Sequence, residues 1–165
     1  MNYKSMRQMT AVVVIFTQLL VACGGLSSKQ KTAADNALKS LKKIEAATQV
    51  GVNYQQYGQL VIDAKAQVNE AASVLPDRDL KKELNATMEA YTDASQAWST
   101  KVSSLSLKPD TEPGATLMRR YNLKTHSFKA GSTELVWLSE DEARQAAWSA
   151  AAEHLLTAQK LLDHQ

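Results

Sequence analysis

The sequence contains few of the residues that cross-link, break or bend a chain. Among its 165 residues are one cysteine, three prolines and six glycines. A single cysteine excludes a disulfide bond within one molecule. Few prolines and glycines, together with an abundance of Ala, Leu, Lys, Gln and Glu, favour helices over strands. The chain is therefore expected to depend on a hydrophobic core between helices for its stability.

The sequence also lacks an apolar segment long enough to cross a membrane. Its most apolar stretch, residues 9–20, covers about a dozen positions, whereas a membrane-spanning helix needs about 20. Residues 1–7, which precede this stretch, carry Lys4 and Arg7 and no acidic residue. A basic segment followed by a short apolar one is the pattern of a signal peptide. We therefore expect residues 1–22 to be a signal peptide and not a permanent transmembrane helix.

The four residues around the end of this segment are Leu20, Val21, Ala22 and Cys23. They resemble the lipobox of bacterial lipoproteins, in which an aliphatic residue and two small or β-branched residues precede an invariable cysteine. The resemblance implies that Cys23 becomes the first mature residue and carries lipid on its sulfur and on its amine. Two or three acyl chains hold a protein at a membrane, whereas one holds it only marginally. The alternative is a free thiol at the end of a buried helix, and an unpaired thiol is a liability in an oxidising compartment.

The residue after Cys23 is Gly24. In lipoproteins of bacteria with two membranes, Asp at this position retains the protein in the inner membrane, so Gly24 implies the outer membrane, facing the periplasm. In a source with a single membrane, the same anchor would imply the cell membrane. The resemblance therefore makes the membrane, reached through the lipid on Cys23, the first expected partner of the mature chain.

The mature chain that this cleavage would leave has no excess of either charge. Removing 22 of the 165 residues leaves 143, which is the size of one domain. Removing Lys4 and Arg7 from the 19 basic residues leaves 17, against 17 acidic residues. Domains that bind nucleic acids usually carry a clear basic excess. We therefore expect no nucleic-acid partner.

Most of the mature sequence has the apolar periodicity of helices. Residues 32–50, 54–75 and about 77–105 each carry apolar or small residues at alternating three- and four-residue spacing. A further helix is expected after Ser139, which has Glu142 at the offset of a capping box. The links between the first three helices are short, so these helices are expected to be antiparallel neighbours.

A long connection, residues 106–138, separates the third and fourth predicted helices. It contains Pro109, Pro113, Gly114 and Gly131 and lacks a sustained periodicity. Such length is typical of functional or disordered loops, and the apolar content of this one favours an ordered, packed loop. A short helical turn is expected around its residues from Leu117 to Tyr121.

The predicted fold is therefore all-α. It is an up-down-up-down four-helix bundle with a long, partly ordered connection between helices three and four. The expected organisation is a signal peptide over 1–22, a tether over 23–31 and a helical bundle domain over 32–165.

One end of the predicted bundle gathers aromatic and cationic residues. With the lipid on Cys23 at one end, the connection lies at the other. Aromatic walls with a few converging polar groups are typical of small-molecule pockets, and arginines are strong donors to anionic groups. The candidate binding residues are Arg119, Arg120, Tyr54, Tyr57, Trp98 and Trp137. In the alternative interpretation the aromatic residues fill space between diverging helices, and the arginines pair with acids of the same molecule, namely Glu134, Glu140, Asp141 or Glu142.

Catalytic and metal-binding motifs are not found in the sequence. His126, His154 and His164 show none of the close spacings of zinc sites. There is no Gly-x-Ser-x-Gly nucleophile motif and no Cys-x-x-Cys-His run for covalent haem. We therefore expect no metal, no cofactor and no enzymatic activity.

The leading hypothesis is a lipid-anchored envelope protein whose bundle is a non-enzymatic interaction or accessory module, with another envelope protein as its partner. The alternative is a small-ligand-binding bundle with a pocket under residues 106–138, and a hydrolase comes third. An exposed apolar patch would favour the module. A concave pocket beneath the connection would favour the ligand binder.

Overall fold

The described part of the protein is a helical bundle with a β-hairpin at one end. The computed structural model describes residues 25–103 and 105–165. The elements in chain order are α1 (Ser28–Val50), α2 (Tyr54–Val74), α3 (Asp79–Val102), α4 (Gly114–Tyr121), β1 (Thr125–Ala130), β2 (Thr133–Leu138) and α5 (Glu140–Asp163). The predicted signal peptide and the expected lipidation site, Cys23, lie outside the described residues.

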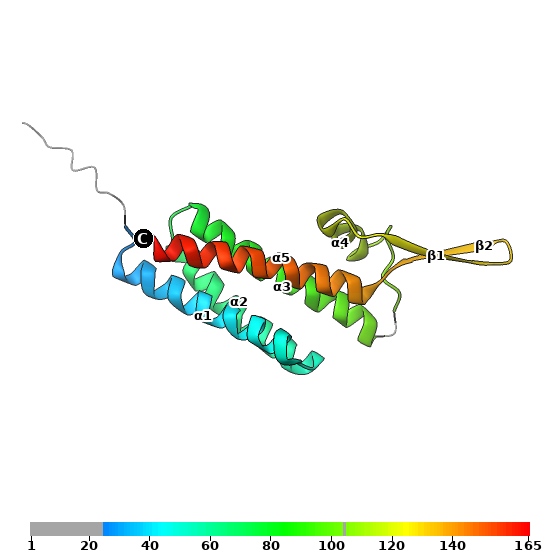
Figure 1. Cartoon of the computed structure of the whole chain (residues 1–165), viewed down its shortest axis with the longest axis horizontal. Helices are drawn as coiled ribbons and strands as arrows, with labels where there is room; N and C mark the ends of the chain where they lie inside the picture. Colours follow the sequence, from blue (N-terminus) through cyan, green and yellow to red (C-terminus); the bar gives the residue numbers. More distant parts are fainter. Residues whose placement is uncertain (1–24, 104) are drawn as a thin grey trace, which may run out of the picture.

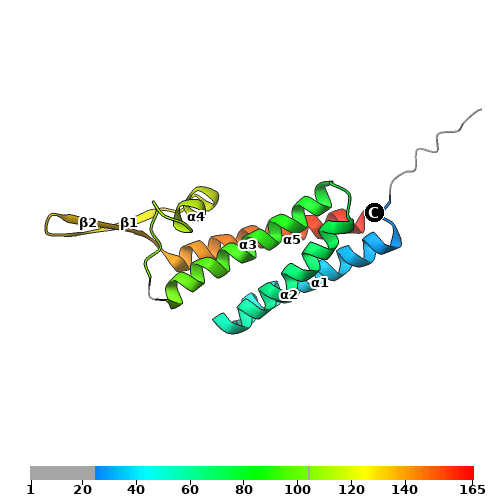
Figure 2. The same ribbon diagram turned by 180° about the vertical axis from the view of Figure 1, so that it is seen from behind.

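The four long helices, α1, α2, α3 and α5, run up and down in chain order (Figure 1). α1 packs chiefly against α2, and α3 against α5, while α2 joins the two pairs through α3. The first and last described residues lie close together, because a Cβ built on Gly25 would lie 3.5 Å from the backbone oxygen of Gln165. This end is the proximal end, and the hairpin projects from the opposite, distal end (Figures 1 and 2). The predicted four-helix bundle is therefore present, and the structure departs from the prediction in the connection between α3 and α5.

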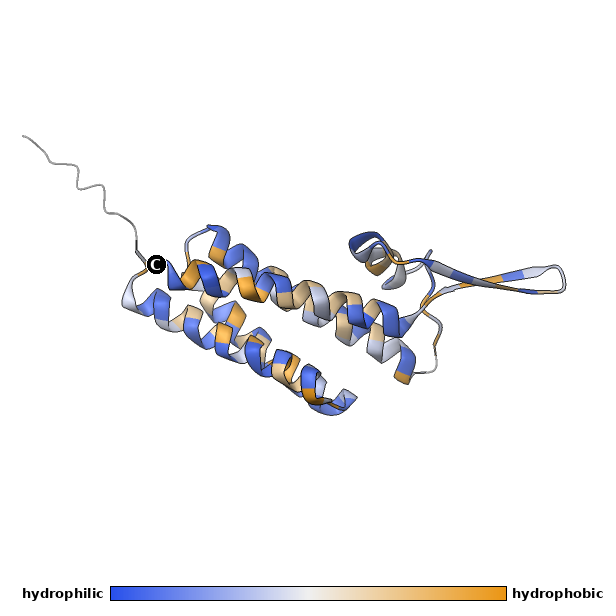
Figure 3. Ribbon diagram, in the orientation of Figure 1, coloured by the Kyte–Doolittle hydropathy of each residue, from blue (hydrophilic) through white to orange (hydrophobic). Residues whose placement is uncertain are grey.

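Sequence periodicity determines which helical faces are buried. The buried residues of α2 are Tyr57, Val61, Ala64, Val68 and Ala71, at the predicted spacing. Apolar and polar bands alternate along the helices as a result (Figure 3). Ser139 accepts the amide of Glu142 at 3.2 Å, which is one half of the predicted capping box. At the start of α2, Asn53 accepts the amide of Gln56 at 2.9 Å. The buried face of α2 is therefore the one that the sequence predicts.

The first helix begins earlier than predicted, at Ser28 and not at Thr32. The reason is a capping box at Ser27 that was not predicted. The Ser27 hydroxyl accepts the amide of Gln30 at 3.3 Å, and the Gln30 side chain accepts the amide of Ser27 at 2.9 Å. Two otherwise unpaired amides are thereby satisfied. The tether expected over 23–31 is consequently helical from residue 28.

The third helix differs from the prediction at its end and on one face. It ends at Val102, before the predicted Leu105, and both side chains are exposed instead of buried. The charged residue Asp93 is buried as well. Side chains of α4 cover this second side of α3, because Arg120 and Tyr121 both bond to Asp93. The buried face of α3 is therefore wider than a single apolar stripe.

The connection departs from the all-α prediction, which the other elements of the described chain support. Its short helical turn is α4, and the residues after it form an antiparallel hairpin with Thr125 opposite Leu138 and Ala130 opposite Thr133. The two-residue loop begins with Gly131, whose φ of 64° is readily accessible to glycine. A Gly-Ser pair between two runs rich in aromatic and β-branched residues is a hairpin signal. The sequence thus contained a signal for the hairpin, which was not predicted.

A second, smaller core joins the connection to the bundle. Its buried residues are Ala97, Leu107, Leu117, Leu138 and Ala143. They come from α3, the segment before α4, α4 itself, the end of β2 and the start of α5. This distal core therefore fixes α4 and the base of the hairpin against the bundle.

Candidate functional site

The hairpin presents an apolar face to solvent. Phe128 and Leu135 are opposite each other in the strand register, so their side chains share one face. Phe128 is 61% exposed and Leu135 is 54% exposed. The next pair toward the bundle on the same face is His126 with Trp137, whose rings stack with centroids 5.9 Å apart. These four residues are referred to below as the hairpin face.

The reverse face of the hairpin is different in character. It carries Lys129 opposite Glu134 and Ser127 opposite Val136. The charges thus lie on the reverse face, and the hairpin face has neither lysine nor carboxylate. A two-stranded hairpin is marginally stable by itself, and exposed apolar patches on soluble domains usually mark contact sites. The hairpin face therefore has the composition of a contact surface.

The base of the hairpin contacts the bundle, while its tip extends away from the bundle (Figure 1). Leu138 is fully buried in the distal core, and its amide donates to the backbone oxygen of Leu107 at 2.8 Å. The His126 ring Nε2 lies 3.3 Å from a carboxylate oxygen of Glu142 on α5. Figure 1 shows the strands extending from this base beyond the ends of α3 and α5. The hairpin is therefore an arm that carries its apolar face away from the bundle.

A polar cleft of about 660 Å³ lies between α3 and α4. Its lining residues are Glu89, Asp93, Gln96, Ser99, Thr100, Glu112, Pro113, Thr116 and Arg120. The cleft lies under the connection, where the small-ligand alternative expects a pocket. Its lining contains three carboxylates, one guanidinium and no aromatic side chain. Such a lining suits neither an anionic ligand nor one that stacks on aromatic rings.

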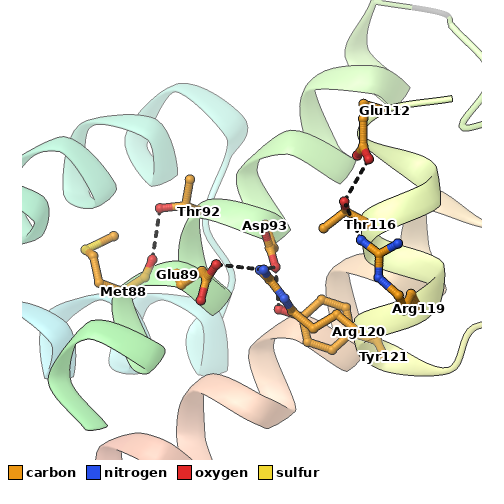
Figure 4. Close-up of polar contacts among 9 residues, drawn as sticks. All are labelled: Met88, Glu89, Thr92, Asp93, Glu112, Thr116, Arg119, Arg120 and Tyr121. Atoms are coloured by element: carbon orange, nitrogen blue, oxygen red, sulfur yellow. Dashed lines mark hydrogen bonds and ion pairs between the residues drawn. The ribbon is translucent and has the colours of Figure 1, made fainter. Parts of the chain in front are cut away.

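The positive charge of Arg120 is balanced by carboxylates inside this cleft. Its Nη1 donates to Asp93, and its Nη2 donates to a Glu89 oxygen at 2.6 Å (Figure 4). The Tyr121 hydroxyl donates to the same Asp93 oxygen at 2.7 Å. Burial, and then the neighbouring Asp93 carboxylate, raise the pKa of Tyr121, so the phenol remains a neutral donor. The four side chains form a closed cluster that ties α4 to α3.

The two candidate arginines therefore do not converge on one ligand. Arg119 donates to the Thr116 hydroxyl at 3.3 Å, which in turn donates to Glu112, and it has no contact drawn to the Asp93 cluster (Figure 4). Arg120 pairs with acids of its own chain, as the structural alternative expects. Those acids belong to α3 and are not the ones that the sequence analysis named.

Three of the candidate aromatic residues meet within the bundle. Tyr54 and Tyr57 pack on Trp98, with ring centroids 5.9 and 5.5 Å apart. Trp148 of α5 completes the cluster and donates its ring N–H to the Tyr57 hydroxyl at 3.0 Å. Tyr57 is fully buried, and burial raises its pKa. These rings fill the space between α2, α3 and α5, while the fourth candidate, Trp137, lies apart in the hairpin.

Both the aromatic cluster and the hairpin contain residues that were not predicted from the sequence. Arg144 lies over the rings of Trp98 and Trp148, at 4.6 and 5.1 Å from their centroids, and its position four residues before Trp148 on a helix was a usable signal. Phe128 and Leu135 belong to the apolar content that predicted only a packed loop. Their signal was the alternation on each side of the Gly-Ser loop.

Comparisons with family models, curated proteins and solved structures found no match. None of the helices within 25–103 and 105–165 combines the length and the apolar character needed to cross a membrane. Over the same residues, no three His, Cys, Asp or Glu side chains gather as metal ligands would.

Proposed function

We propose that this protein is a lipid-anchored envelope lipoprotein and that its bundle is a non-enzymatic module that binds another envelope protein through the hairpin face. The observation that carries the proposal is the exposed Phe128–Leu135 pair on an arm whose base is fixed. Aromatic residues are enriched in protein contact surfaces, and charged residues are depleted from their centres. The hairpin face has both properties.

The lipid anchor and the hairpin would lie at opposite ends of the elongated bundle. The described chain begins at the proximal end, so a lipid on Cys23 would hold that end at the membrane. α5 has 24 residues and rises about 36 Å, and a six-residue strand adds about 20 Å. The tip of the hairpin would therefore reach about 55 Å from the anchored end. A partner located away from the lipid surface fits this geometry.

The small-ligand alternative has weaker support. The aromatic residues on which it depended are packed inside the bundle or carried on the hairpin, and Arg120 is already paired. The residues that line the cleft under the connection are polar or charged apart from Pro113. Ligand pockets are usually lined by apolar and aromatic side chains with a few polar groups.

The contact is tested by photo-crosslinking in cells. The photoreactive residue p-benzoylphenylalanine replaces Ser132 in the loop of the hairpin, and the adduct with a second envelope protein is measured on a gel. The double substitution Phe128→Ser with Leu135→Ser should lower the adduct at least about tenfold, the effect of losing about 1.4 kcal/mol or more of binding free energy. Ile62→Ser is the matched control, because Ile62 is 64% exposed but lies on α2. Absence of an adduct, or an equal yield from the double variant, would overturn the proposal.

The anchor is tested separately with Cys23→Ser. The wild-type chain should incorporate labelled palmitate and remain with the membranes, while the variant should lose the label and become releasable. A native protein that retains residues 1–22, or that carries no acyl chain on Cys23, would contradict the lipoprotein assignment.

A further inference from the structure

The outer edge of β2 carries the start of a third strand. Leu107 forms an antiparallel bridge with Leu138 and accepts its amide at 2.8 Å. The amide of Leu107 donates to a Glu140 carboxylate oxygen at 3.3 Å. In a continued strand the residue facing Val136 would be Pro109, which has no N–H to donate. The chain therefore supplies one residue of this strand and then leaves the edge.

The bridge shows which backbone groups of β2 point outward. In an antiparallel strand the N–H and C=O of one residue point to the same side, and successive residues alternate. Since Leu138 points outward to Leu107, Val136 and Glu134 also point outward, and Leu135 and Trp137 point toward β1. The hairpin loop gives the same assignment, because the residues that flank a two-residue loop form a hydrogen-bonded pair. Within the described chain, β1 and β2 form a two-stranded sheet, so the outward groups of Val136 and Glu134 have no strand partner there.

The two edges of the hairpin differ in their suitability for strand pairing. β1 has the sequence Thr-His-Ser-Phe-Lys-Ala, with Lys129 near its end. Lysine on an edge strand hinders pairing with another chain. β2 contains the consecutive apolar residues Leu135, Val136 and Trp137, and Val136 is 40% exposed. The open edge of β2 is therefore the one disposed to pair.

We infer that the partner binds by strand addition, in which an extended segment of the partner protein pairs antiparallel with β2 in the row that Leu107 begins. This inference rests on the proposed function and specifies its binding mode. Backbone groups of Val136 and Glu134 supply four hydrogen bonds, which is how added strands gain affinity. The hairpin face then continues across a third strand.

The register also specifies the chemistry of the added segment. Its residue opposite Leu135 joins the hairpin face and is apolar, while its residue opposite Glu134 lies on the reverse face and is basic. Its residue opposite Val136 is apolar. Because the added strand runs against β2, the segment has the order apolar, apolar, basic from its amino end.

The decisive variant is Val136→Pro in the full-length, lipidated chain, assayed by crosslinking from position 132. Proline at this position removes an outward N–H that the added strand needs but none that bonds β2 to β1. Val136→Thr is the matched control, because it keeps the N–H and the β-branched shape. The adduct should fall at least about tenfold in Val136→Pro and stay within about twofold of wild type in Val136→Thr.

Hydrogen exchange on the purified wild-type adduct and on the free protein gives a second, independent measurement. In the free protein the amides of Leu135 and Trp137 should exchange slowly and those of Glu134 and Val136 rapidly, and the latter two should slow in the complex. Unchanged exchange at Glu134 and Val136 would overturn strand addition even if Val136→Pro fails to form the hairpin.

The outcomes separate the two proposals. If Val136→Pro keeps the adduct while the Phe128→Ser and Leu135→Ser pair loses it, side chains alone cover the hairpin face. Strand addition is then wrong and the proposed function stands. If the wild-type chain gives no adduct, the proposed function fails and the inference fails with it.

Discussion

In the bundle, 23 buried residues of the described chain form one core, whereas the distal end rests on a core of five. Besides this small core, the distal end has polar contacts, chiefly the ion pair of Arg120 with Asp93 and the hydrogen bond of Tyr121 to Asp93. It also leaves Phe128, Leu135 and Val136 exposed on the hairpin. The comparison indicates that the bundle supplies stability, while the distal end holds a surface in a defined position.

The largest expected effects come from equal truncations in the two cores. Leu41→Ala removes a fully buried side chain of the bundle and should lower the free energy of unfolding by about 2–5 kcal/mol. Leu117→Ala removes an equally buried side chain of the distal core. Hydrogen exchange should rise throughout the chain in the first variant, and chiefly in α4 and the hairpin in the second. Global loosening by Leu117→Ala would mean that the two regions form one cooperative unit.

Substitutions of two glycines, one in each region, provide the next comparison of the distal end with the bundle. A Cβ on Gly114 would lie 2.0 Å from the backbone oxygen of Lys108, so Gly114→Ala forces the backbone before α4 to shift and should cost about 1–3 kcal/mol. A Cβ on Gly58 would meet no atom within 4 Å. Because Gly58 is inside α2, Gly58→Ala should stabilise the bundle by about 0.5–1 kcal/mol. Chemical denaturation measures both, and destabilisation by Gly58→Ala would show a close contact that the structure lacks.

The ion cluster between α3 and α4 is expected to have an intermediate effect. Asp93→Asn leaves Arg120 without its buried partner and should destabilise the distal end by about 1–3 kcal/mol. Glu89→Gln alters the more exposed pair and should cost less than about 1 kcal/mol. Thermal unfolding and exchange in α4 provide the measurement. Equal effects would remove the special role assigned to Asp93.

The ionisation of the buried tyrosines is expected to have the smallest effect on stability near neutral pH. Its effect appears at alkaline pH. Burial raises the pKa of Tyr91 and of Tyr57 above the ordinary value of 10.0, so the unfolded chain loses these protons first. The stability contribution of each is complete below pH 10 and declines as pH rises above it. Each should lower the free energy of unfolding by about 1.4 kcal/mol per pH unit in that range. Tyr91→Phe should make the decline measured between pH 10 and 11 less steep, and an unchanged slope would contradict this cause.

The bundle was predictable because its signal is repeated many times. The predicted stripe of α2 runs from Tyr54 to Leu75, and each position after the half-buried Tyr54 is buried as expected. One misplaced residue does not alter a period that is sustained over several turns. The hairpin has only six residues in each strand, and its exposed apolar residues resemble those of a packed loop. Short apolar runs are ambiguous for this reason, and the Gly-Ser loop was the one local signal that distinguished them.

The candidate site was only partly predictable because its contacts are tertiary. Tyr54, Tyr57 and Trp98 lie on predicted stripes, and their meeting follows from the antiparallel order of the helices. The burial of Asp93 depends on how α4 folds back onto α3, which no local pattern in α3 indicates. The face of Phe128 and Leu135 likewise depends on the strand register.

Measuring stability and partner binding on the same preparation of the Phe128→Ser, Leu135→Ser chain tests the central claim most directly. Both side chains are exposed, and surface substitutions usually change stability by no more than about 0.5 kcal/mol. The account predicts an unfolding midpoint within about 2 °C of wild type and a crosslinked adduct reduced at least about tenfold. A large fall in the midpoint with the adduct retained would show that the hairpin face stabilises the fold and is not the contact surface.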